Sequence, residues 1–137
     1  MASREDVEQM RRFGEALGMA FQIQDDILDF SRSAQTGKPA NNDLREGKIT
    51  LPLIEVLDRV TAAQKSEILA AVERAATYAD AVEFIHQQVE QYGGVEAAKA
   101  TLQRFLQRGL SELSQLEESD YRQSLIDLCT FVAERDR

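Results

Sequence analysis

Apolar side chains recur at helical spacing in the N-terminal part of the chain, from Glu5 to about Ser31. The residues that follow this period are Val7, Met10, Phe13, Leu17, Ala20, Phe21, Ile27 and Leu28. This pattern predicts one long helix, whose second half is unusually apolar. Residues 31–48 then lack any periodicity and combine Ser, Thr, Asn, Gly and Pro, which predicts an extended loop. Long loops within compact domains are often functional.

Five further stretches show helical spacing, at residues 49–59, 61–75, 80–94, 95–116 and 119–135. In the first of them Thr50 can cap the helix and Pro52 lies in the first turn. The second stretch opens with the capping-box spacing Thr61 to Gln64, and the third should stop at the glycine pair of residues 93–94. Because no stretch alternates with a period of two, the predicted fold is all-α, a bundle of about six helices.

The chain is acidic, with a net charge of −8 and a sequence pI near 4.7. Since no stretch gathers enough Lys and Arg to follow a phosphate backbone, we expect no binding to nucleic acid or to an anionic membrane surface. No apolar run approaches the ~20 residues of a membrane-spanning helix, so stable membrane insertion is not expected. The N-terminal residues lack the features of a signal peptide, and the single cysteine, Cys129, should face a helical core. Together these features predict a soluble cytoplasmic protein.

Three aspartates stand within the apolar stretch FQIQDDILDF, residues 21–30. On a helix, Gln22, Asp25, Asp26 and Asp29 fall within about 100° of one another, and we call these four residues the acidic arc. The apolar residues that occupy most of the remaining circumference are Phe13, Leu17, Ala20, Phe21, Ile23, Ile27, Leu28 and Phe30. We therefore expect this helix to be enclosed by protein, with the acidic arc facing a polar cavity.

Two glycines, Gly14 and Gly18, lie upstream on the same side of this helix. A glycine inside a helix costs about 1 kcal/mol relative to alanine. Two of them, four residues apart, therefore suggest that this side needs the close approach of either a ligand or a neighbouring backbone.

The chemistry of the acidic arc indicates a magnesium ion and a diphosphate. Clustered carboxylates repel each other unless they are protonated or neutralised, and hard oxygen ligands are those that Mg²⁺ prefers. Because Mg²⁺ commonly completes its coordination with phosphate oxygens, one or two direct protein ligands are sufficient. The predicted loop supplies matching cations, since Lys38 and Lys48 each follow a glycine and lie on either side of Asp43.

Simpler interpretations stand beside this one. Acidic clusters on helices are usually solvated faces, and lysines that follow glycines are mostly exposed turn residues. We interpret His86 as a half-buried packing residue rather than a ligand or a base. Arg11, almost four turns before Asp25, is interpreted as a surface charge.

The segments FGEALGMAFQIQDDILDF and TGKPANNDLREGKITLPLI resemble the second aspartate-rich region of the trans-isoprenyl diphosphate synthases, also called the polyprenyl synthetase family. The residues that match the family pattern GxxFQxxDDxxD are Gly18, Phe21, Gln22, Asp25, Asp26 and Asp29. The resemblance runs from about residue 10 to the C-terminus. It implies a helical bundle of the isoprenoid synthase type, with a central cavity in which two aspartate-rich motifs face each other.

This resemblance implies a prenyltransferase that condenses an allylic diphosphate with isopentenyl diphosphate and uses Mg²⁺. In that reaction Mg²⁺ and lysines stabilise the departing diphosphate, the double bond of isopentenyl diphosphate attacks the allylic cation, and a proton is lost. The implied metal ligands are Asp25, with Asp26 and Asp29 assisting partly through water. The implied substrate-binding residues are Gln22, Phe21, Lys38, Lys48 and Asp43, of which Lys38 and Lys48 join Asp25 as catalytic residues.

The chain departs from the family pattern because it holds only one aspartate-rich motif. The first such motif, and the basic segment that binds isopentenyl diphosphate in the family, have no counterpart in residues 1–137. The resemblance therefore implies that these residues are the C-terminal part of one isoprenoid synthase domain, inactive alone. Apolar helix faces left uncovered should drive dimerisation or association with the missing N-terminal half. The alternative is a non-catalytic helical partner subunit of a prenyl diphosphate synthase. A terpene cyclase of the same fold class fits less well, because a loop with two Gly-Lys pairs belongs to the enzymes that elongate prenyl chains.

Overall fold

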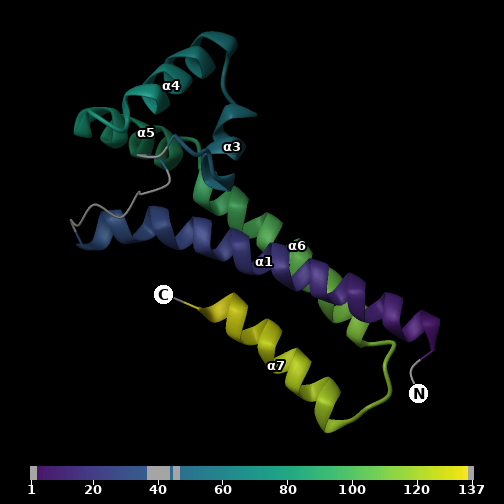
Figure 1. Cartoon of the computed structure of the whole chain (residues 1–137). Helices are drawn as coiled ribbons and strands as arrows, with labels where there is room; N and C mark the ends of the chain where they lie inside the picture. The colour runs from purple at the N-terminus through teal and green to yellow at the C-terminus, as the bar shows by residue number, and fades with distance from the viewer. Residues whose placement is uncertain (1–2, 37–43, 45–46, 136–137) are drawn as a thin grey trace. The chain divides into compact units, whose positions relative to one another are not determined.

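The computed structural model describes residues 3–36, 44 and 47–135, with only the backbone of residues 31–36. The helices in these ranges are α1 (Arg4–Thr36), α3 (Leu51–Leu57), α4 (Ala62–Arg74), α5 (Ala79–Gln91), α6 (Gly94–Leu113) and α7 (Asp120–Glu134) (Figure 1). Within this described part no residue lies in a β-strand. The all-α prediction is therefore confirmed.

Helix α1 is longer than its apolar pattern predicted. It continues to Thr36 instead of ending near Ser31, so the first residues of the predicted loop are helical. The stretch SRSAQT is polar, which is why it lacks periodicity, but it contains neither Gly nor Pro. These residue types are tolerated in a helix, so the polar composition misplaced the boundary.

The predicted helix caps are confirmed for α4 and only in part for α3. Thr61 and Gln64 form the reciprocal capping box at the start of α4. Thr50 occupies the N-cap position of α3, and Pro52 lies in its first turn, but the Thr50 side chain makes no capping hydrogen bond. The sequence spacing correctly located the first turns of α3 and α4. It could not show that the Thr61 side chain makes a capping hydrogen bond whereas the Thr50 side chain does not.

The two glycines predicted to end α5 have different roles. Helix α5 ends at Gln91, and Gly93 follows with a φ of +66°, a left-handed conformation that favours glycine. Gly94 begins α6 and lies so close to Pro52 that an added methyl group would collide with the carbonyl oxygen of Pro52. The glycine pair thus ends one helix and lets the next one approach α3.

The chain divides into two compact units, and the first consists of Asp26–Lys99. In this α3–α5 unit, α5 packs beside α4 and α3 (Figure 1). The buried residues of its apolar core are Phe30, Leu44, Leu53, Val56, Ile68, Ala71, Val72, Ala75, Ala81, Ile85 and Val89. Phe30, close to the acidic arc in sequence, therefore anchors the end of α1 in this core.

The second unit combines Met1–Asp25 with Ala100–Arg137, and we call it the α7 unit. Here the C-terminal end of α7 contacts α1, since Gln24 of α1 donates hydrogen bonds to the carbonyl oxygens of Ala133 and Arg135. Gln9, a buried polar residue of α1, donates hydrogen bonds to the carbonyl oxygen of Glu112 (2.6 Å) and to the side chain of Gln115 (3.1 Å). Cys129 is buried, as predicted, and burial raises the pKa of its thiol.

Candidate functional site

The acidic arc lies on the single continuous helix α1. Gln22 is exposed, whereas Asp25, Asp26 and Asp29 are each half-buried. Because one helix carries all four residues, Asp25 and Asp29 follow each other at a rise of about 6 Å along its axis. Their partial burial shows that neighbouring groups cover part of each aspartate.

Asp25 contacts a cation of the α7 unit that sequence analysis did not identify. The guanidinium of Arg135 lies 2.6 Å from the Oδ1 atom of Asp25, and the two side chains are 20% and 38% exposed, respectively. The same guanidinium stacks over the ring of Phe21, 4.5 Å from its centroid. The C-terminal end of α7 therefore lies against the part of α1 that carries Asp25.

The side chain of Gln24 fixes this end of α7 in place. Gln24 is 7% exposed, and its Nε2 donates hydrogen bonds to the carbonyl oxygens of Ala133 (3.3 Å) and Arg135 (2.9 Å). The last carbonyl groups of a helix have no partner within the helix, so a neighbouring amide satisfies them. The family resemblance, which runs to the C-terminus, was the one sequence signal that included this segment.

Helix α1 is not enclosed on all sides, which corrects the expectation from its apolar circumference. Phe21 is 43% exposed and Met19 is 47% exposed. The helical pattern correctly marked the residues that α1 buries, including Ile23 and Ile27. It could not show how much of the Phe21 ring stays exposed beside the Arg135 guanidinium stacked on it.

The two remaining aspartates belong to the α3–α5 unit. The Oδ2 atom of Asp29 is buried, while Asp26 is half-buried. Across the described residues, no group of three or more His, Cys, Asp or Glu side chains is placed to enclose a metal ion. The metal role expected of the acidic arc stays a prediction.

The predicted loop is only partly described. Lys48 is exposed and lies just before α3. It follows Gly47, whose φ of +78° is a left-handed conformation that favours glycine. Lys38 and Asp43 lie outside the described residues. The roles expected of these three residues stay predictions.

Gly14 and Gly18 are exposed on α1. A side chain added at either glycine would meet no atom within 4 Å. Within the described chain, no neighbouring backbone approaches them, so of the two predicted reasons only a ligand or a separate chain could need this space.

His86 and Arg11 lie as the sequence predicted. His86 is half-buried and packs against Phe30, with ring centroids 5.1 Å apart; burial lowers the pKa of His86, and the charge of Glu90 opposes that shift. Arg11 is exposed and pairs with Glu8 and Glu15 of the same helix. Neither residue belongs to the acidic arc.

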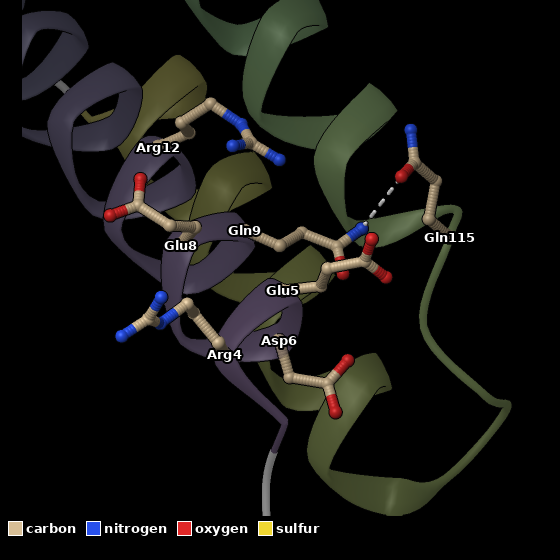
Figure 2. A pocket seen from close by; sticks show the side chains of 7 residues that line it. All are labelled: Arg4, Glu5, Asp6, Glu8, Gln9, Arg12 and Gln115. Atoms are coloured by element: carbon tan, nitrogen blue, oxygen red, sulfur yellow. Dashed lines mark hydrogen bonds between the residues drawn. The ribbon is translucent and has the colours of Figure 1, made fainter.

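A surface hollow of about 610 Å³ lies at the start of α1, away from the acidic arc (Figure 2). Its lining residues are Arg4, Glu5, Asp6, Glu8, Gln9, Arg12 and Gln115. Gln9 is separated from Asp25 by about 24 Å along the helix axis. The hollow has lining residues of both charges, and Gln9 donates a hydrogen bond to Gln115. These features indicate a polar contact between α1 and the residues at the end of α6 rather than a reaction centre.

The described helices include none that is long and apolar enough to cross a membrane.

Comparison with known proteins gives consistent matches to one family. The family model described as Polyprenyl synthetase matches residues 1–89. The short chain isoprenyl diphosphate synthase of Methanothermobacter thermautotrophicus is 32% identical over 137 residues, which are 98% of this chain and 41% of that protein. Heptaprenyl diphosphate synthase component 2 of Geobacillus stearothermophilus is 36% identical over 133 residues, which are 95% of this chain and 40% of that protein.

A solved structure extends the match to the fold. The polyprenyl synthase of Caulobacter crescentus CB15, complexed with calcium and isoprenyl diphosphate, matches with a TM-score of 0.82 and 27% identity, covering 99% of this chain and 42% of that chain. The present chain thus spans about 40% of the length of the curated relatives it matches.

Proposed function

Because the chain belongs to the polyprenyl synthetase family, we propose that it supplies the second aspartate-rich part of a prenyltransferase site. The reaction is the condensation of an allylic diphosphate with isopentenyl diphosphate to give a longer polyprenyl diphosphate. One observation carries the proposal: the acidic arc is intact on one helix, and its three aspartates are half-buried.

The proposed cofactor is Mg²⁺, held by Asp25 with help from Asp26 and Asp29. These carboxylates fit a metal that is completed by phosphate oxygens, since Mg²⁺ commonly uses one or two carboxylates together with a substrate. The Caulobacter relative was solved with calcium and isoprenyl diphosphate, which supports a divalent cation and a diphosphate as the ligands proposed here. When bound, the metal neutralises charge that develops on the leaving diphosphate.

The other residues of the site have roles toward the substrates. Gln22, exposed beside Asp25, donates or accepts a hydrogen bond with the allylic substrate, and Phe21 offers an exposed apolar ring to its hydrocarbon part. Lys48, exposed ahead of α3, pairs with the diphosphate, and Lys38 contacts the allylic substrate. Asp43 positions a water molecule near the metal.

A second candidate role is that of a helical partner subunit that is not itself catalytic. The Geobacillus relative is named as component 2 of its synthase, so that protein works as one component among others. Both roles require a further polypeptide, because the present chain matches only part of its relatives. They differ in whether Asp25 takes part in the reaction.

A complementation experiment tests the proposed function. The chain is mixed with the complementary N-terminal segment of the Methanothermobacter relative, Mg²⁺ and both diphosphates, and prenyl products are measured. We expect no product from the chain alone and activity from the mixture. Asp25→Asn should lower this activity by about 100-fold or more, since a preorganised charge at the reacting group is lost.

The control is Asp127→Asn, which removes an exposed carboxylate of α7 that accepts a hydrogen bond from Gln123. This variant should keep the activity of the mixture. Full activity in the Asp25→Asn mixture would contradict the catalytic role and favour the partner-subunit role.

A further inference from the structure

Three separate interactions hold Arg135 beside Asp25. The guanidinium donates to the Oδ1 atom of Asp25 at 2.6 Å, and it stacks on Phe21 at 4.5 Å from the ring centroid. The main chain at Arg135 is fixed as well, because its carbonyl oxygen accepts a hydrogen bond from the buried Gln24. A surface arginine held by one ion pair would sample many rotamers, whereas this one is restrained at both its backbone and its tip.

The contact places a cation on an oxygen that the proposed metal would use. A carboxylate oxygen bonded to a guanidinium has fewer lone pairs left for a metal ion. A divalent cation at Asp25 would also lie within a few ångströms of the guanidinium, where like charges repel each other strongly in a partly buried site. Arg135 and the metal therefore compete for Asp25.

We propose that Arg135 is a positioning residue that competes with the divalent cation for Asp25 and is exchanged for it when the cation binds, so that it lowers the metal affinity of the site. This inference rests on the proposed function, which assigns the metal to Asp25. It goes beyond the proposed function, because it states that the residue at the C-terminal end of α7 lowers the metal affinity of Asp25.

The alternative is that Arg135 assists metal binding, and it predicts a different result when Arg135 is removed. If Arg135 only orients Asp25 for the metal, its removal should weaken metal binding. If Arg135 competes with the metal, its removal should strengthen binding. The sign of the change in metal affinity therefore decides between the two.

The test uses Mn²⁺ as the probe, titrated into the full chain while free Mn²⁺ is followed by electron paramagnetic resonance. Arg135→Gln should lower the dissociation constant about fivefold, the size expected when one partly exposed charge contact is removed. Arg135→Lys keeps a charge but loses the planar fork, so its dissociation constant should lie between those of the wild type and Arg135→Gln.

Arg122→Gln serves as the matched control. Arg122 is the other half-buried arginine of α7, about 20 Å from Arg135 along the helix, and its loss changes the net charge by the same amount. Its dissociation constant should equal that of the wild type. Circular dichroism checks that each variant keeps the helical fold.

Asp25→Asn separates the two proposals. If it weakens Mn²⁺ binding while Arg135→Gln leaves binding unchanged or weaker, the metal role of Asp25 stands and the competition by Arg135 is overturned. If Asp25→Asn binds Mn²⁺ as well as the wild type, the metal role of Asp25 fails. Absence of Mn²⁺ binding in both the wild type and Arg135→Gln overturns the competition by Arg135, because its removal then leaves Asp25 no better a ligand.

A second measurement observes the exchange directly. The Nε–Hε signal of Arg135 in an NMR spectrum, assigned by its loss in Arg135→Gln, should move on addition of Mg²⁺ toward its position in Asp25→Asn. A signal that does not respond to saturating Mg²⁺ would overturn the proposed displacement, whatever the affinities are.

Discussion

A methyl group added at Gly94 would meet the carbonyl oxygen of Pro52, whereas one added at Gly14 would meet no atom within 4 Å. Both glycines are helical, so their effects on backbone entropy are similar. What differs is their surroundings: Gly94 is buried against α3 and Gly14 is exposed. The same substitution should therefore have opposite effects at the two positions.

We predict that Gly94→Ala lowers the free energy of unfolding by about 1–3 kcal/mol, because the added methyl group can be accommodated only by moving backbone. Gly14→Ala should instead raise it by up to about 1 kcal/mol, since alanine is the better helix former and the space is open. Denaturation by urea, followed by circular dichroism, measures both. Equal effects of the two substitutions would show that the close approach of α6 to Pro52 does not exist in solution.

The start of α4 depends on a side chain in a way that the start of α3 does not. Thr61 accepts a hydrogen bond from the backbone N–H of Gln64, and the Gln64 side chain accepts one from the backbone N–H of Thr61. Thr50 stands at the corresponding position of α3 without such a bond. We predict that Thr61→Ala lowers the free energy of unfolding by about 1 kcal/mol, the usual value of an N-cap residue.

Thr50→Ala is the matched variant for this helix-cap prediction. It should cost less than about 0.5 kcal/mol, because no capping bond is lost. Urea denaturation at constant pH compares the two variants. A larger loss for Thr50→Ala than for Thr61→Ala would refute the assignment of the caps.

Local patterns predicted most of the helices because a helix is stabilised by residues three and four apart along the chain. All the signals that predicted helices correctly act over such short distances. They are the apolar periodicity, the Thr61 capping box at the start of α4 and the glycines that follow α5. The end of α1 was misplaced because polar composition alone resembles a loop.

The contacts around the acidic arc could not be predicted in the same way. Gln24 and Arg135 are 111 residues apart in sequence, and no local spacing connects them. The exposure of Phe21 likewise depends on which segments cover α1, not on its helical position. Tertiary contacts of this kind therefore required the structure.

Helix α1 presents an exposed side in its N-terminal part, which reaches the Arg135 contact at Phe21. Val7, Gly14, Gly18 and Phe21 lie within about 60° of one another on a helical projection, and all four are exposed. Asp25 shares this side. An apolar, glycine-containing face of this kind typically receives another chain or a ligand, and the chain spans only about 40% of its relatives.

We predict that Gly18→Leu weakens binding of the complementary segment by about tenfold or more, because a bulky side chain then fills the open face. The chain itself should not be destabilised, since nothing lies within 4 Å of Gly18 and leucine favours a helix. Gln107→Leu, at an exposed position of α6, controls for added apolar bulk and should bind normally. Isothermal titration calorimetry gives the affinities, and urea denaturation confirms that both variants are as stable as the wild type. Unchanged binding by Gly18→Leu would mean that the second polypeptide docks elsewhere, and that the glycines of α1 serve a ligand instead.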